Sequence, residues 1–260
     1  MTSSQQKQIL VNVENEVVTI TLNRPERGNS LNSSMVFELL DAFNSAIVEK
    51  SIRVIVLTGA GKFFCTGLDL KIGNKSIEEA SEIFEVGLRL YQTIKECPKP
   101  VIARINGPAL GGGIGLIFTT DLRIAVSDAY FSFLEVKRGL IPAIISLYIV
   151  PEIGTFKAKQ YMLSGEKVTV DQAVSDKFLT CVVKNLKCLD DKVAQYAEEL
   201  LSSAPGAMGT IKKLTNVIGS SSTDELKKQH VKQTFLEMLD SEEAAYGMSS
   251  FGQKKKPDWS

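Results

Sequence analysis

The chain has 260 residues, of which 44% are hydrophobic and 23% charged, an ordinary composition for a globular protein that is long enough to bury a sizeable core. Its 30 basic and 30 acidic side chains balance, so the strong basic excess typical of nucleic-acid binders is absent. Four scattered cysteines without a CxxC pair and a single histidine lack metal-ligand spacing, so we expect free thiols and no metal site.

The N-terminal residues 1–16 show no targeting signal. They contain no apolar core of signal-peptide length and are not Arg-rich like a transit peptide. No apolar run in the chain approaches the roughly 20 residues that a membrane helix needs. We therefore expect a cytoplasmic protein, with a processed protein of the mitochondrial matrix as the alternative.

The first half of the chain alternates short apolar strands with amphipathic helices. Residues 32–34 can cap a helix whose apolar side chains from Met35 to Ile47 recur at helical spacing. A second helix is traced by apolar residues from Ile77 to Ile94 and closed by Cys97-Pro98. The expected strands are residues 17–22, 54–57, 101–105, 122–125 and 130–133, several of them continuous apolar runs that suit strands buried on both faces.

The second half of the chain is mainly helical. We expect a short helix at residues 113–118 and a helical segment at residues 146–163, broken near Pro151 and Gly154. Amphipathic helices follow at residues 189–200, 207–218 and 224–239. The strand-strand-helix rhythm of the first part suggests stacked turns of a coil, although no literal repeat occurs.

Two glycine-containing loops carry the strongest chemical signal. Residues 59–70 (GAGKFFCTGLDL) and residues 106–116 (NGPALGGGIGL) each follow a buried strand, and the second loop leads into a helix. Glycine allows a backbone N–H to approach a ligand closely, and the start of a helix adds N–H dipoles that favour developing negative charge. The alternative is that these glycines only form tight turns. Neither loop has the GK[ST] ending of a phosphate loop or the GxGxxG turn of a dinucleotide site.

The order of these motifs resembles the crotonase superfamily, the enoyl-CoA hydratases and isomerases. The resemblance rests on Asn23-Arg24-Pro25, residues 64–69 (FCTGLD), residues 106–116 and residues 121–125 (DLRIA), and it covers nearly the whole chain. Residues 131–154, the GGGIGL variant and the ending 252–259 most resemble the 3-methylglutaconyl-CoA hydratase-like branch.

This resemblance implies an α/β fold of the crotonase-like (ClpP/crotonase) type. Residues 1–190 would form a spiral of ββα turns that binds the acyl-CoA, and residues 191–260 a C-terminal helical trimerisation region. The resemblance further implies a homotrimer or hexamer, an acyl-CoA thioester substrate, and no cofactor besides the coenzyme A of that substrate. No membrane or nucleic-acid partner is expected.

The resemblance also assigns the catalytic groups. The backbone N–H groups of Leu68 and Gly112 would form an oxyanion hole around the thioester oxygen, and Glu135 would be the general acid/base. Family hydratases carry a second glutamate, whose position is Gly115 here. Burial of Glu135 should raise its pKa, whereas the alternative is a surface ion pair with neighbouring Lys137 or Arg138.

The glycine at position 115 suggests a charged substrate. A 3-methylglutaconyl group carries its own carboxylate, which a nearby glutamate would repel. Gly115 would remove that repulsion and leave room for acyl bulk or ordered water, and Arg138 or Lys137 could supply a counter-charge.

Coenzyme A binding is assigned to the segment around the first loop. Lys71 would lie near the phosphates, and Arg24 or Arg27 would compensate for Glu26, which stands where family members have a lysine. The residues that the resemblance assigns to substrate and CoA binding are Phe64, Thr66, Gly67, Asp69, Leu70, Lys71, Arg24, Arg27 and Gly111.

The sequence therefore predicts an acyl-CoA-binding enzyme that stabilises a thioester enolate. Its leading reaction is hydration of a 2-enoyl-CoA, branched or carboxylated such as 3-methylglutaconyl-CoA, in fatty-acid or branched-chain amino-acid catabolism. One alternative is a Δ3,Δ2-enoyl-CoA isomerase that uses Glu135 alone. The other is a non-catalytic module that binds acyl-CoA or RNA.

Overall fold

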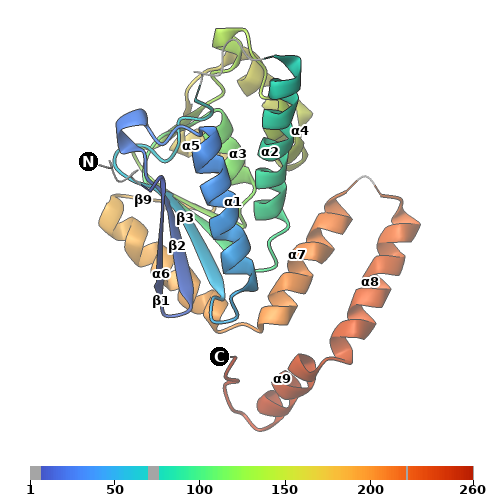
Figure 1. Cartoon of the computed structure of the whole chain (residues 1–260). Helices are drawn as coiled ribbons and strands as arrows, with labels where there is room; N and C mark the ends of the chain where they lie inside the picture. Colours follow the sequence, from blue (N-terminus) through green and yellow to red (C-terminus); the bar gives the residue numbers. More distant parts are fainter. Residues whose placement is uncertain (1–6, 70–75, 221, 260) are drawn as a thin grey trace.

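A computed structural model describes residues 7–69, 76–220 and 222–259. Its body consists of two β-sheets with helices packed around them, and an arm of C-terminal helices extends from this body (Figure 1). The larger sheet has the strand order β1-β2-β3-β4-β6-β9, and the smaller one the order β5-β7-β8. The strands are β1 Ile9–Glu14, β2 Val17–Leu22, β3 Val54–Gly59, β4 Val101–Ile105, β5 Ala109–Leu110, β6 Leu122–Val126, β7 Tyr130–Ser132, β8 Val168–Thr169 and β9 Cys181–Val183.

Helices cover the sheets and form the arm. The short 3-10 helices η1 Pro25–Arg27 and η3 Val136–Arg138 follow β2 and β7. The α-helices are α1 Ser33–Val48, α2 Ile77–Lys95, α3 Gly112–Phe118, α4 Ala143–Ser164, α5 Val170–Ser175, α6 Leu186–Leu201, α7 Pro205–Gly219, α8 Asp224–Leu239 and α9 Glu242–Gly252.

The larger sheet is parallel from β2 to β9, and only the edge strand β1 runs antiparallel to its neighbour. Every residue of β3 is buried, as expected for a central parallel strand with both faces covered. Because parallel strands need long connections, each one is followed by a loop or helix at the same edge of the sheet. The two glycine-containing loops leave this edge after β3 and β4.

Helix caps confirm the predicted starts of the first two long helices. The Asn32 side chain accepts a hydrogen bond of 2.8 Å from the amide of Met35 at the start of α1. At α2, Ser76 and Glu79 form a reciprocal capping box. Such caps satisfy backbone N–H groups that have no partner within the helix, which fixes where each helix begins.

Strands β1, β5, β8 and β9 and helices α5 and α9 were not predicted, and helix α4 differs in detail from its prediction. Strand β1 pairs with β2 through a turn at Asn15 and Glu16, whose φ values of 48° and 63° are positive. Helix α4 has one break, at Gly154 (φ 78°, ψ 155°), which confirms the prediction there, whereas Pro151 lies inside the helix. The break near these two residues thus lies at the glycine, whose positive φ interrupts the helix three residues after the proline.

The C-terminal arm consists of α7, α8 and α9 (Figure 1). Helix α6 contacts β3, β4, β6 and β9, so it packs on the body, and the predicted division at residues 190 and 191 falls within this helix. No residue of α8 is buried in the described chain. Large apolar side chains of the arm are exposed, among them Ile211, Phe235, Leu239, Met248 and Phe251.

Candidate active site

The first glycine-containing loop is held between two other backbone segments. On one side, the amide of Leu31 donates to the carbonyl of Gly67 at 2.8 Å, and the amide of Asp69 donates to the carbonyl of Leu31 at 2.9 Å. On the other side, the amide of Leu110 donates to the carbonyl of Cys65 at 2.9 Å. The loop is therefore fixed in an extended conformation beside the second loop.

This pairing sets the direction of the Leu68 amide. In an extended segment, the polar groups of successive residues point to opposite sides. Since the Gly67 carbonyl and the Asp69 amide both face Leu31, the Leu68 N–H faces away from Leu31, toward the second loop. Within the described part of the chain, this N–H has no backbone acceptor.

The amide of Gly112 lies beside the same point. A Cβ placed on Gly67 would be 3.0 Å from the Gly112 nitrogen, and a Cβ placed on Gly112 would be 3.7 Å from the Leu68 nitrogen. Gly112 is the first residue of α3, so its N–H has no partner inside the helix, and none is recorded outside it among the described residues. The structure thus brings together the two amides that the resemblance assigns to an oxyanion hole.

Glu135 lies against the residue that precedes Gly112. A Cβ on Gly111 would be 2.9 Å from Oε1 of Glu135, and Gly111 has a φ of 48°, so the close approach of this carboxyl group requires glycine. Oε2 of Glu135 is buried and has no hydrogen-bond partner among the described residues. Burial raises the pKa of Glu135, while a backbone hydrogen bond and the charge of Arg138 oppose that rise. A carboxyl group of this kind is suited to proton transfer.

The structure contradicts the expectation that Gly115 leaves free space. Gly115 is buried, and a Cβ at this position would be 2.3 Å from Cγ2 of Ile145 and 2.9 Å from Cε1 of Tyr91. These two side chains occupy the volume that a larger residue at position 115 would need. The glycine therefore accommodates packing between helices and leaves no room there for acyl bulk or ordered water.

The residues assigned to CoA binding are only partly placed. Arg24 donates to the Ser30 carbonyl at 2.6 Å and pairs with Asp69 at 3.2 Å, so its guanidinium joins the segment after β2 to the first loop. Phe64 is fully buried, which leaves only its backbone to face a ligand. Arg27 is exposed, and Thr66 is partly buried. Leu70 and Lys71 lie outside the described residues.

Sequence reasoning missed two buried asparagines that hold the first loop. The Asn29 side chain donates to the carbonyls of Ala60, Phe63 and Phe64 at distances of 2.8–3.2 Å. Asn106 accepts from the Gly59 amide at 3.0 Å and donates to the Gly61 carbonyl at 3.0 Å. The motifs around both asparagines were recognised, but local sequence does not reveal bonds to a segment more than 30 residues away.

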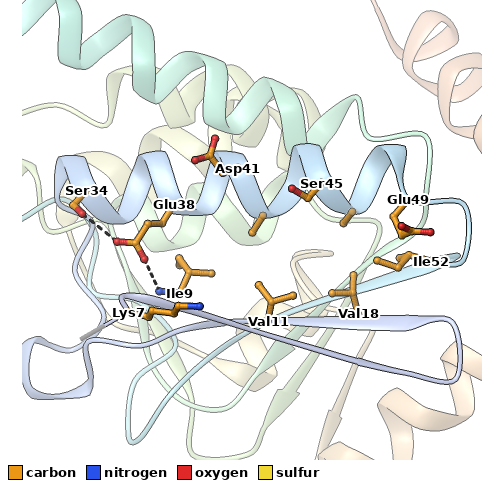
Figure 2. A pocket seen from close by; sticks show the side chains of 12 residues that line it. Lys7, Ile9, Val11, Val18, Ser34, Glu38, Asp41, Ser45, Glu49 and Ile52 are labelled. Carbon is orange, nitrogen blue, oxygen red and sulfur yellow. Dashed lines mark hydrogen bonds between the residues drawn. The ribbon is translucent and has the colours of Figure 1, made fainter. Parts of the chain in front are cut away.

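A large groove lies elsewhere, between α1 and the β1–β2 hairpin (Figure 2). It has a volume of about 690 Å³, and none of the predicted site residues lines it. Glu38 at its rim accepts hydrogen bonds from the amides of Gln8 and Ile9 at 3.0 and 3.2 Å. This carboxylate therefore fixes the start of β1, and the groove lies apart from the converging amides.

The described residues contain no group of three or more His, Cys, Asp or Glu side chains that could hold a metal ion. Likewise, no helix of the described chain is long and apolar enough to cross a membrane.

The fold and the site define an α/β protein in which a half-buried carboxyl group lies near two backbone amides that have no acceptor among the described residues. Residues 12–260 match the family described as enoyl-CoA hydratase/isomerase, and the chain belongs to this family. Its crotonase-type fold is confirmed by a crystal structure of an enoyl-CoA hydratase from Shewanella pealeana, with a TM-score of 0.93 and 27% identity over 98% of this chain and 97% of that one.

The curated relatives include both a hydratase and an isomerase. The chain is 38% identical to the enoyl-CoA hydratase ACTT6 of Alternaria alternata over 90% of its own length and 78% of that protein. It is 32% identical to the 1,2-epoxyphenylacetyl-CoA isomerase of Escherichia coli over 96% and 97% of the two chains. The protein is therefore an acyl-CoA enzyme of the hydratase/isomerase family.

Proposed function

We propose that the protein transfers a proton at the α-carbon of an enoyl-CoA thioester and, in particular, shifts the double bond of a 3-enoyl-CoA to the 2-position. The observation that carries this proposal is the occupied volume at Gly115. Ile145 and Tyr91 fill the place of a second carboxylate, so Glu135 would act as a single acid/base. An isomerase needs only one such group, because the same proton leaves one carbon and returns to another.

The proposed reaction conserves all atoms. The Glu135 carboxylate removes a proton from C2, and the released electron pair moves into the thioester carbonyl, whose oxygen becomes negative. The amides of Leu68 and Gly112 donate hydrogen bonds to that oxygen. The dienolate then takes the proton back from Glu135 at C4, which leaves the double bond between C2 and C3.

Hydration of a 2-enoyl-CoA is the second candidate, and the likeness to the enoyl-CoA hydratase of Alternaria favours it. In this reaction water adds its oxygen to C3 and a proton to C2. With one carboxyl group, Glu135 would have to orient the water and also deliver the proton. The assignment to 3-methylglutaconyl-CoA keeps as support its sequence resemblance and the removal of a like charge at Gly115, but the free space expected there is occupied.

The test is turnover of the purified full-length protein with matched substrates. We expect the protein to convert 3-hexenoyl-CoA to 2-hexenoyl-CoA faster than it hydrates crotonyl-CoA or 3-methylglutaconyl-CoA. Isomerisation is measured as a rise in the absorbance of the conjugated enoyl thioester, and hydration as a fall in that absorbance. Faster hydration than isomerisation would overturn the preferred reaction and support the second candidate. Binding of these thioesters, or of RNA, without any turnover would instead support a binding module.

We also propose that the arm assembles three copies of the chain, alone or as two stacked trimers. Its support is the exposed apolar face of the arm, with Phe235 and Leu239 exposed by 60% and 50%, respectively. Such a surface is unusual for a monomer and typical of an interface. Light scattering should give three or six times the chain mass of 28.5 kDa, and Phe235→Asp should reduce it. A wild-type mass equal to one chain would contradict this proposal. The cytoplasmic location remains a prediction from the sequence.

A further inference from the structure

Tyr91 of α2 reaches the backbone that supplies one of the two amides. Its hydroxyl donates a hydrogen bond of 2.9 Å to the carbonyl oxygen of Gly112. A Cβ placed on Gly112 would be 2.9 Å from the same hydroxyl. Tyr91 is only 5% exposed, so this contact is inside the protein. A side chain 21 residues earlier in the sequence thus touches Gly112 itself.

The ring of Tyr91 has a second role in the same place. Together with Ile145 of α4, it fills the volume above Gly115, where its Cε1 would be 2.9 Å from an added Cβ. Tyr91 and a larger side chain at position 115 are therefore mutually exclusive in this packing. The tyrosine and the glycine belong to one arrangement that joins α2, α3 and α4.

We propose that Tyr91 is a positioning residue of the oxyanion hole, whose hydroxyl keeps Gly112 oriented while its ring closes the side of the site at Gly115. The inference rests on the proposed function, since it assigns the Gly112 amide to the thioester oxygen. Without the hydroxyl, the first turn of α3 loses a hydrogen bond from α2. The Gly112 N–H can then rotate, so that it no longer points to the same oxygen as the Leu68 N–H. Small displacements of such donors have large effects on the stabilisation of a developing charge.

The hydroxyl of Tyr91 remains a donor throughout the pH range of the protein. Burial raises its pKa well above the ordinary tyrosine value, and the neighbouring Cys65 and Glu135 act in the same direction. The hydrogen bond to Gly112 should therefore be independent of pH, in contrast to the ionisation of Glu135.

The test compares Tyr91→Phe with Tyr148→Phe in the full-length protein. The rings of Tyr91 and Tyr148 are neighbours, with centroids 5.9 Å apart. Tyr148 donates no hydrogen bond to Gly112 in the described structure. The charged group that influences the pKa of Tyr148 is Glu96, whereas Glu135 influences that of Tyr91. The probe is butyryl-CoA with a ¹³C-labelled thioester carbonyl, which has no double bond to hydrate or isomerise. Binding should shift the carbonyl stretching band of this probe to lower frequency, because the two amides polarise the carbonyl.

We expect Tyr91→Phe to reduce this band shift and to lower kcat on enoyl-CoA about tenfold, less than the roughly 100- to 1000-fold loss typical of removing an oxyanion donor itself. KM should stay within about twofold, and Tyr148→Phe should behave like the wild type. An unchanged band in Tyr91→Phe, or an equal reduction in Tyr148→Phe, would overturn the role of Tyr91. If Tyr91→Phe reduced the band shift but the wild-type protein turned over no enoyl-CoA, the role of Tyr91 would be supported and the proposed function refuted. No band shift in the wild type would refute both.

Discussion

Glu135→Gln should lower kcat for double-bond isomerisation by roughly 100- to 10,000-fold, the range expected when a general acid/base is lost. Glutamine keeps the size and hydrogen-bonding shape of the side chain but cannot accept and return a proton. The two amides and the rest of the site are unchanged by this substitution, so the dissociation constant of butyryl-CoA should stay within about threefold. Turnover by absorbance and thioester binding by calorimetry measure the two quantities separately.

The pH dependence of this variant gives an independent check. Burial raises the pKa of Glu135 in the folded protein above its value in the unfolded chain, so ionisation of this group costs stability as pH rises through its folded-state pKa. Glutamine does not ionise. The thermal stability of Glu135→Gln relative to the wild type should therefore increase as the pH rises above about 4, near the ordinary glutamate pKa, and should level off above the raised pKa of the folded protein.

Glu198→Gln is the matched control for both measurements, because Glu198 is exposed on α6 and forms no ion pair with the residues that the structure describes. It should change neither turnover nor the pH dependence of stability. Wild-type activity should rise with pH through the raised pKa of Glu135, since the carboxylate is the form that removes the first proton. Retention of turnover in Glu135→Gln, or loss of thioester binding with it, would contradict an acid/base role.

Local patterns in the sequence predicted the elements of the fold that depend on local rules. Helical spacing located α1 and α2, with a capping residue at the start of α1, and the continuous apolar runs located β3 and β4. Strand β1 was missed because five of its six residues are not buried, so its side chains give no alternating pattern, and its turn has Asn-Glu in place of the usual Asn-Gly.

The sequence predicted those parts of the candidate site whose reacting groups lie within a recognisable motif. The resemblance identified Glu135 and the loops of Leu68 and Gly112, and the structure places these groups together. The function of Gly115 could not be deduced in this way, because it depends on Tyr91 and Ile145, which belong to other helices. Contacts between distant segments decide whether a glycine opens a cavity or accommodates a neighbour.

Gly67→Ala should lower kcat by roughly 100- to 1000-fold through separation of the two amides. An added Cβ at Gly67 would lie 2.8 Å from the Leu110 carbonyl oxygen and 3.0 Å from the Gly112 nitrogen, which are both backbone atoms. Because neither atom can rotate away like the end of a side chain, the two loops must move apart. The Leu68 and Gly112 amides would then no longer reach one oxygen. Stability should also fall, by about 1–3 kcal/mol for the overpacking.

Gly67 has a φ of 88°, so alanine at this position would also strain the backbone. This strain must be distinguished from the separation of the two loops by the added Cβ. Gly154→Ala provides the control, because Gly154 also has a positive φ of 78° and an added Cβ there meets nothing within 4 Å. Both variants should lose stability, but only Gly67→Ala should lose turnover and the shift of the butyryl-CoA carbonyl band. If folded Gly67→Ala turned over substrate like the wild type, the thioester oxygen could not be held between these two loops. Equal loss of turnover in Gly154→Ala would instead assign the effect to strain in the fold as a whole.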